Sequence, residues 1–382
     1  MNINDLLKIT AQHGASDLHI KAGSYPMMRL RGGLVPVTED QRLSHEDVVT
    51  MTAAVMSRTH AEKFKDAQEV DLAYGVAGLG RFRVNVFLQR GTVGMVLRVI
   101  PTQIKGIDDL NLPAVLKKIA SEERGLVLVT GTTGSGKSTS LAAMIDHINQ
   151  TRCTHVMTVE DPIEFLHRDN QSIINQREVA VDTKSFAHAL RSALRQDPDV
   201  ILVGEMRDFE TVETALLAAE TGHLVLSTLH TLDATETINR IIAVFPPHQQ
   251  KQVRIQLASV LRAVISQRLM PTADGRNRVP AVEVMVSTSF IRDCIVDKEK
   301  TYMIHSAISA GTSQYGMQTF DQAIFGLYAQ GKVGYEEALR WASNVDEFKL
   351  KVQGISTTAD MSRDQMARTV VGGGMPEITR FG

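Results

Sequence analysis

The stretch GTTGSGKS, residues 131–138, is the most informative about the fold of this 382-residue chain. It fits the pattern G-x-x-x-x-G-K-[ST], it follows the apolar run GLVLVT, and it precedes the helical sequence TSLAAMIDHINQ. A strand, a glycine-rich loop and a helix in this order form a cradle for phosphate groups, so a chance match is disfavoured. Backbone N–H groups would hold the phosphates, Lys137 would reach the β- and γ-phosphates, and the Ser138 hydroxyl would ligate Mg²⁺.

The loop predicts a site for ATP and Mg²⁺. The predicted nucleotide-binding residues are Gly131, Thr132, Thr133, Gly134, Ser135, Gly136, Lys137, Ser138 and Thr139.

Apolar runs alternate with helical sequence from residue 114 onward. GLVLVT, HVMTVE, DVILVG and HLVLST are short and continuous, which is typical of strands buried on both faces of a parallel sheet. We predict that TINRIIAVFPPHQQKQVRIQLASVLRAVISQRLM forms two helices broken at Pro246-Pro247, with more helix to about residue 352. Residues 114–355 are therefore predicted to form one α/β domain with helices at its C-terminal end.

Residues 1–100 predict a separate, smaller α/β domain. INDLLKITAQHG is expected to be a helix, PMMRLRGGLVPV a hairpin, and SHEDVVTMTAAVMSRTHAEKF one helix capped by Ser44, before three strands. The Pro, Gly and Asp content of 101–113 predicts a linker. Residues 356–382 lose apolar periodicity and are predicted to be a mobile tail.

Acidic residues follow two of the predicted parallel strands. VMTVEDPIEF carries Glu160, Asp161 and Glu164, and VILVGEMRD carries Glu205. Because ligands bind at the carboxyl ends of parallel strands, these acids are expected near the phosphate loop. One would help hold Mg²⁺ and another would orient the attacking water. The alternative is that each acid only complements a helix N-terminus.

Two histidines and two arginines raise further candidates. TGHLVLSTLHT places His223 and His230 at the ends of a strand, and His230 is the stronger candidate for a γ-phosphate sensor, although a lone histidine is commonly structural.

In RFRVNVFLQR, residues 81–90, Phe82 and its alternate neighbours form an apolar face, whereas Arg81 and Arg83 point the other way. These arginines are either solvated charges or groups that reach a ligand.

Composition limits the classes of function. A net charge of −2 and 5% aromatic residues disfavour a protein that binds nucleic acid through its phosphates. Two cysteines, Cys153 and Cys294, are too few for a disulfide framework or a four-cysteine zinc site and fit a reducing cytosol. The sequence predicts no signal peptide and no membrane-spanning segment.

Four motifs together resemble one family. GTTGSGKST, VEDPIEF, VGEMRD and TGHLVLSTLHT, in this order, resemble the secretion ATPase superfamily and, within it, the type IV pilus retraction motors of the PilT and PilU branch. The resemblance implies a hexameric ring of subunits, each with a PAS-like N-terminal domain and a RecA-like P-loop NTPase core. It implies that Glu164 is the catalytic acid, that Glu205 is the Walker B acid near Mg²⁺, and that His230 belongs to a histidine box.

The resemblance also assigns a role to arginines of the N-terminal domain. Arg81, Arg83 and Arg98 match family positions that reach the nucleotide, and in a ring a neighbouring subunit can deliver them. An arginine supplied from outside a P-loop site is worth about 10³–10⁵ in rate, which is why Arg81 and Arg83 are predicted to be the trans half of the site.

The implied function is a hexameric ATP-hydrolysing motor for pilus retraction and twitching motility. The implied partners are an inner-membrane platform protein and a paralogous retraction ATPase, at the cytoplasmic face of the inner membrane. FIRDCI, residues 290–295, resembles the retraction motif AIRNLI but departs from it at Phe290, Asp293 and Cys294.

The residues leave more than one function open. VGEMRD and FIRDCI favour a PilT-like retraction motor, whereas GMVLRVI and the length of the C-terminal segment are nearer a PilU-like accessory ATPase. The phosphate loop is also compatible with a RecA-like motor on nucleic acid and with a ring subunit that does not hydrolyse ATP. A subunit without hydrolysis is disfavoured because every expected catalytic position is occupied.

Overall fold

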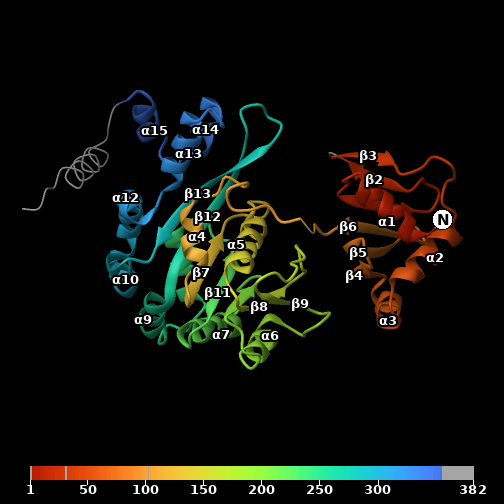
Figure 1. Ribbon diagram of the computed structural model, residues 1–382, viewed down its shortest axis with the longest axis horizontal. Coiled ribbons are helices and arrows are strands. Elements are labelled where there is room, and N and C mark those ends of the chain that lie inside the picture. Colours follow the sequence, from red (N-terminus) through yellow and green to blue (C-terminus); the bar gives the residue numbers. More distant parts are fainter. Residues whose placement is uncertain (1, 31, 102, 355–382) are drawn as a thin grey trace, which may run out of the picture. The chain divides into compact units, whose positions relative to one another are not determined.

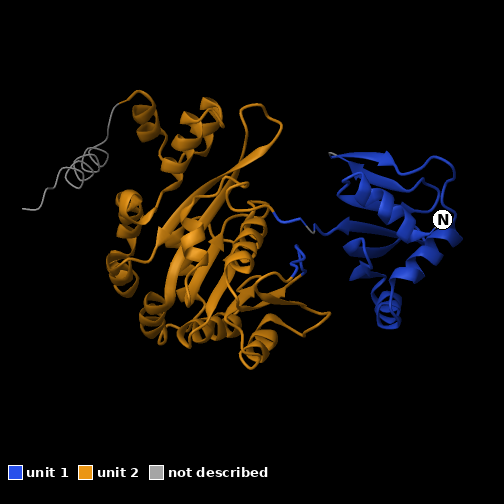
Figure 2. Ribbon diagram, viewed as in Figure 1, with its two compact units in different colours: residues 1–104, 162–168 blue, residues 105–161, 169–382 orange. Residues whose placement is uncertain are grey.

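The computed structural model describes residues 2–30, 32–101 and 103–354, so the tail predicted at 356–382 lies outside the described residues. The chain divides into two compact units (Figure 2). The first contains residues 1–104 together with 162–168, and the second contains residues 105–161 together with 169 onward. Each unit has its own sheet and its own hydrophobic core.

The first unit is a six-stranded antiparallel sheet covered by helices. Its strand order is β3-β2-β1-β6-β5-β4, and Leu7, Leu18, Val84 and Leu97 are fully buried in its core. Its elements are α1 (Ile3–Gln12), β1 (Asp17–Lys21), β2 (Met27–Leu30), β3 (Gly33–Pro36), α2 (His45–Val55), α3 (Arg58–Ala67), β4 (Glu69–Val76), β5 (Gly80–Gln89) and β6 (Thr92–Val99). The predicted first helix, hairpin and three strands are confirmed.

One helix prediction in this unit is wrong. The single helix expected over residues 44–64 is two helices, because the chain is extended at Met56 and Ser57 starts α3. The Ser57 hydroxyl accepts the His60 N–H, as an N-cap does, and this side-chain bond competes with a continuous helix. The Ser44 cap is confirmed, and Asp47 completes its capping box.

The second unit is built on a seven-stranded sheet of order β13-β12-β7-β11-β10-β8-β9 (Figure 1). All neighbouring strands are parallel except β13, which pairs antiparallel to β12. The four strands predicted from apolar runs are confirmed. The strands are β7 (Gly125–Thr130), β8 (His155–Glu160), β9 (Ile173–Glu178), β10 (Val200–Val203), β11 (Leu224–Leu229), β12 (Leu261–Pro271) and β13 (Arg278–Val286).

The prediction of helix over residues 261–270 is wrong, because LRAVISQRLM forms β12. This strand lies between β7 and β13 and is buried on both faces, so its apolar run has no period that separates strand from helix. Helix α9 ends at Val260 and the strand begins at the next residue, without a loop that sequence could reveal. The prediction that helix continues to about residue 352 is also wrong over residues 278–286, which form β13, and strand β9 was not predicted.

Helices cover both faces of this sheet (Figure 1). Alternate residues of β7 enter two cores: Val127 and Val129 pack with α4 and α5, whereas Leu126 and Leu128 pack with α7, α8 and α9. Ile107 and Leu112, from the segment predicted as a linker, are buried in the first of these cores. The helices are α4 (Val115–Ala120), α5 (Lys137–Thr151), α6 (Phe186–Ala193), α7 (Phe209–Glu220), α8 (Ala234–Ala243), α9 (Gln250–Val260), α10 (Ser289–Val296), η1 (Lys298–Met303), α11 (Ile304–Ala310), α12 (Thr312–Tyr315), α13 (Phe320–Ala329), α14 (Tyr335–Trp341) and α15 (Val345–Val352).

Over the described part of the chain, no helix has both the length and the apolar character needed to cross a bilayer.

Candidate active site

The phosphate loop joins the end of β7 to the start of α5, and its glycines are required by geometry. Gly131 has φ +138°, and a Cβ at this position would lie 2.5 Å from the Gln267 carbonyl oxygen and 2.6 Å from Ser135 Oγ. Gly136, with φ +93°, is the N-cap of α5 and has no side chain to compete for the first N–H groups of the helix. The loop is therefore shaped to present backbone N–H groups to an anion.

Lys137 and Ser135 give the interior of this loop its polarity. The Lys137 side chain is buried, and its Nζ donates hydrogen bonds to the carbonyl oxygens of Gly131 at 2.8 Å and Thr132 at 3.0 Å. Ser135 Oγ is buried, and no residue in the described part of the chain forms a hydrogen bond with it. A buried ammonium and an unsatisfied hydroxyl beside a helix N-terminus fit the polyphosphate of a nucleotide.

The parallel register brings the ends of four strands to the same edge of the sheet. Val203 at the end of β10 is paired with Val159 of β8, and Leu229 at the end of β11 is paired with Thr130, which precedes the phosphate loop. Glu160 ends β8 at this edge, where its carboxylate accepts hydrogen bonds from Thr158 Oγ1 at 2.6 Å and from Gln176 Nε2 at 3.2 Å. Polar and acidic side chains therefore converge where a parallel sheet binds ligands.

Glu205 and His230 lie close together at this edge. Glu205 Oε2 lies 3.6 Å from His230 Nε2 and 2.8 Å from Arg207 Nε. The Glu205 side chain is largely buried, whereas those of Arg207 and His230 are exposed. Sequence analysis did not identify Arg207, although its position two residues after Glu205 placed it in the same motif.

The acids at this edge suit a magnesium ion that the nucleotide helps to bind. No group of three or more His, Cys, Asp or Glu residues in the described ranges could hold a metal ion by itself. Magnesium in phosphoryl-transfer sites is commonly held by one or two protein oxygens, phosphates and water. Ser138 in the first turn of α5 and Glu205 provide such oxygens, and their role as ligands stays a prediction.

His223 does not belong to this edge. It precedes β11 at the amino end, its carbonyl oxygen accepts the Gly125 N–H, and its Nδ1 lies 2.9 Å from the Ala218 carbonyl oxygen. The weaker of the two histidine candidates is therefore a structural residue of the turn between α7 and β11.

Three arginines lie in a row with one aspartate across the sheet of the first unit. In the register, Arg83 of β5 is opposite Arg98 of β6, Arg98 is opposite Asp17 of β1, and Asp17 is opposite Arg29 of β2. Arg98 Nε donates to Asp17 Oδ1 at 2.9 Å. Burial would raise the pKa of Asp17, but the Ser16 hydroxyl and Arg98 hold that pKa below its usual value.

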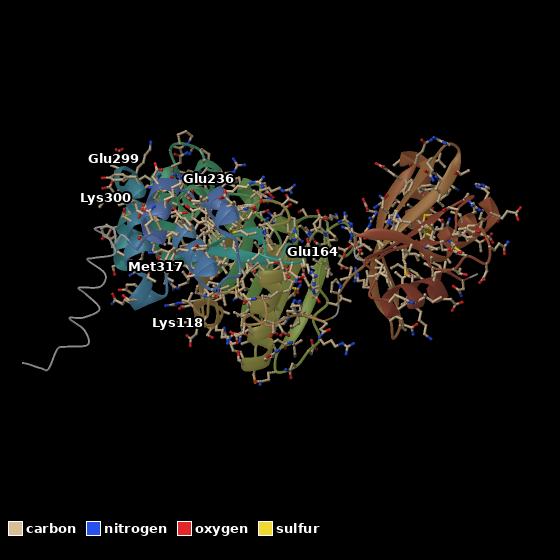
Figure 3. The ribbon with its side chains drawn as sticks, turned by 90° about the horizontal axis from the view of Figure 1, so that it is seen from above. Lys118, Glu164, Glu236, Glu299, Lys300 and Met317 are labelled. Atoms are coloured by element: carbon tan, nitrogen blue, oxygen red, sulfur yellow. The ribbon has the colours of Figure 1, made fainter. Side chains whose placement is uncertain are left out.

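The contacts of Arg98 differ from those of Arg83. Arg98 is bound to a buried carboxylate, whereas Arg83 forms a longer ion pair, of 4.0 Å, with the exposed Asp71. Arg81 is half-buried. Glu164, labelled in Figure 3, is exposed and lies in the segment 162–168 that belongs to the first unit, whereas the phosphate loop belongs to the second. The nucleotide-directed roles of Glu164, Arg81, Arg83 and Arg98 stay predictions.

A phosphate loop after a central parallel strand, with acids at the carboxyl edge of the sheet, defines a P-loop ATPase with a RecA-like core. The chain belongs to the family described as Type II/IV secretion system protein, which matches residues 2–374. The prediction of a secretion ATPase is confirmed.

Two curated relatives and one solved structure cover most of the chain. The Pseudomonas aeruginosa protein named "Type IV pilus retractation ATPase PilT" is 45% identical over 91% of this chain and 100% of its own length. "Type IV pilus ATPase PilU" of the same species is 43% identical over 94% of each chain. A crystal structure of "the Pilus Retraction Motor PilT and Bound ADP" has a TM-score of 0.84, with 47% identity over 91% of this chain and 98% of that one.

Proposed function

We propose that this chain is the ATP-hydrolysing motor of type IV pilus retraction. The observation that carries the proposal is that the chain is similar to PilT over the whole length of that relative, while its own phosphate loop encloses the Lys137 ammonium and Glu205 Oε2 lies 3.6 Å from His230 Nε2. ATP would bind with its phosphates in the loop at 131–139. Lys137 would contact the phosphates, and Mg²⁺ would be held by Ser138 and, through water, by Glu205.

The proposed assembly is a homohexamer in which a neighbouring subunit completes each site. Arg81 and Arg83 would be delivered to the nucleotide by the neighbour, and Glu164 would orient the attacking water. The exposed side chain of Arg83, with its long ion pair, is consistent with that role. Arg98 would act through its bond to Asp17, by ordering the same row of the sheet. The motor would work at the cytoplasmic face of the inner membrane, on a platform protein and beside a paralogous retraction ATPase.

A PilU-like accessory ATPase is the second candidate. Its support is that the PilU relative aligns with 94% of this chain, slightly more than the PilT relative does. Deletion of the gene separates the two candidates. A retraction motor predicts heavily piliated cells without twitching motility, whereas normal twitching in the deletion strain would contradict it and favour the accessory role.

A motor on nucleic acid predicts a different result with purified protein. Hydrolysis of ATP by the full-length chain should be unchanged when single-stranded DNA or RNA is added. Strong stimulation by single-stranded nucleic acid would contradict the proposal of a pilus motor.

A further inference from the structure

Glu283 is a buried acid that neither the phosphate loop nor the acidic edge uses. It lies in β13, within the apolar run AVEVMV, and its side chain is 2% exposed. Its Oε1 accepts the backbone N–H of Ala234 at 3.0 Å, across 49 residues of sequence. Burying a carboxylate in a strand costs free energy unless the carboxylate has a partner. The partner of Glu283 therefore indicates the role of this residue.

Ala234 is the first residue of α8, and neither the N-cap side chain nor water accepts its backbone N–H. The N-cap is Asp233, whose carboxylate accepts the N–H of Glu236 and not that of Ala234. Ala234 is fully buried, so water is excluded. The first N–H groups of a helix have no partner within the helix, and Glu283 supplies the one that Ala234 needs.

The segment bound to α8 consists of residues 231–233, which directly follow His230. Thr231 and Thr237 share a hydrogen bond of 2.6 Å between their hydroxyls. The Leu232 N–H donates to the carboxylate of Glu236, which is labelled in Figure 3. Side-chain hydrogen bonds therefore bind residues 231–233 to the first turn of α8. His230 joins this segment directly to the end of β11.

Residues 230–233 are connected by two routes to β7, the strand that precedes the phosphate loop. On one side Leu229 of β11 pairs with Thr130, the residue before Gly131. On the other side Glu283 pairs with Ser266 of β12, and Ser266 Oγ accepts a hydrogen bond from Thr130 Oγ1 at 2.9 Å. Glu283 is therefore the link between α8 and the sheet at the level of the phosphate loop.

We propose that Glu283 is a positioning residue for ATP hydrolysis: its carboxylate holds the start of α8 and thereby fixes His230 beside Glu205. The proposal rests on the ATPase activity and is independent of whether hydrolysis drives pilus retraction. The charged form of Glu283 holds α8 more firmly than the neutral form, because a carboxylate accepts a stronger hydrogen bond and interacts favourably with the helix N-terminus.

Three charged groups face Glu283 from the elements packed around it: Asp233 at the N-cap of α8, Arg268 of β12 and Asp321 of α13. Burial raises the pKa of Glu283 to about 7, the two aspartates act in the same direction, and the Ala234 N–H and Arg268 oppose them. The interaction of Glu283 with the start of α8 therefore weakens as the pH falls through 7 and Glu283 takes up a proton.

The test is a double-mutant cycle measured by steady-state ATP turnover of the full-length protein. Glu283→Met removes the acceptor and fills the space, and it should lower kcat about 10- to 100-fold while the KM for ATP changes by less than about threefold. Glu283→Gln keeps a neutral acceptor, as protonated Glu283 does, and should recover part of the lost turnover. In a His230→Ala background Glu283→Met should cause little further loss, because the two residues act through one another. Glu213→Gln, an exposed change on α7, is the matched control.

Each outcome decides the proposal. Wild-type turnover in Glu283→Met, no recovery in Glu283→Gln, or an undiminished effect of Glu283→Met in the His230→Ala background would overturn it. If Glu283→Met does not fold, the pH profile of Glu283→Gln decides. Loss of the limb near pH 7 that the wild type shows supports the proposal, and an unchanged profile overturns it. A wild type that hydrolyses no ATP would instead refute the ATPase assignment.

Discussion

Glu283 makes the stability of the second unit depend on pH in a direction that can be worked out. Its pKa rises from an ordinary value of 4.5 to about 7, chiefly because the side chain is buried. The folded state therefore binds this proton more tightly than the unfolded state does. Ionisation of Glu283 therefore lowers the free energy of unfolding. This cost is absent below pH 4.5, grows as the pH rises from 4.5 to 7, and is complete above pH 7. When Glu283 is fully ionised, the cost is about 3 kcal/mol.

Glu283→Gln removes the charge and keeps a hydrogen-bond acceptor for Ala234. The free energy of unfolding of this variant, relative to the wild type, should therefore rise by about 2–3 kcal/mol between pH 5 and pH 8. This difference corresponds to a shift of about 0.7–3 M in the urea midpoint. Fluorescence of Trp341, the one tryptophan of the chain, reports unfolding of the second unit.

Measuring both proteins at each pH cancels the titration of all other groups. Glu213→Gln should show no pH-dependent difference from the wild type, because Glu213 is exposed. A difference between Glu283→Gln and the wild type that stays constant from pH 5 to pH 8 would refute the reasoning.

Three further variants test other parts of the structure. Gly131→Ala should abolish nucleotide binding, measured with a fluorescent ATP analogue, because its Cβ would meet the Gln267 carbonyl oxygen; binding at wild-type affinity contradicts this geometry. Replacing Arg81 and Arg83 together by alanine should lower ATP turnover by about 10³-fold or more while binding persists; unchanged turnover would make them solvated charges. Ser57→Ala should cost the first unit about 1 kcal/mol through loss of the α3 cap, seen in urea unfolding, and no loss would argue against the cap.

Local rules of sequence predicted the position of the phosphate loop between a strand and a helix. The spacing of GTTGSGKS after an apolar strand locates the phosphate loop, because that loop is made from consecutive residues. Glu205 and His230 are distant in sequence, yet they could be predicted to meet, since both follow parallel strands that end at the same edge.

What the sequence could not predict depends on contacts between distant segments. The sequence of β12 also fits a helix, because the strand is buried on both faces and follows α9 without a turn. The break at Ser57 depends on one side-chain bond that competes with a good helical pattern. Glu283 gave one signal, an acid inside an apolar run, but its partner Ala234 becomes known only when β13 is placed beside α8.

The most direct test of the central claim is ATP turnover by the purified full-length protein and its Lys137→Ala variant. We expect Mg²⁺-dependent hydrolysis by the wild type and its loss in Lys137→Ala, because the buried ammonium of Lys137 lies inside the phosphate loop. Glu164→Gln should lose turnover as well, while nucleotide binding persists. Hydrolysis at the wild-type rate in Lys137→Ala would contradict the assignment of the site.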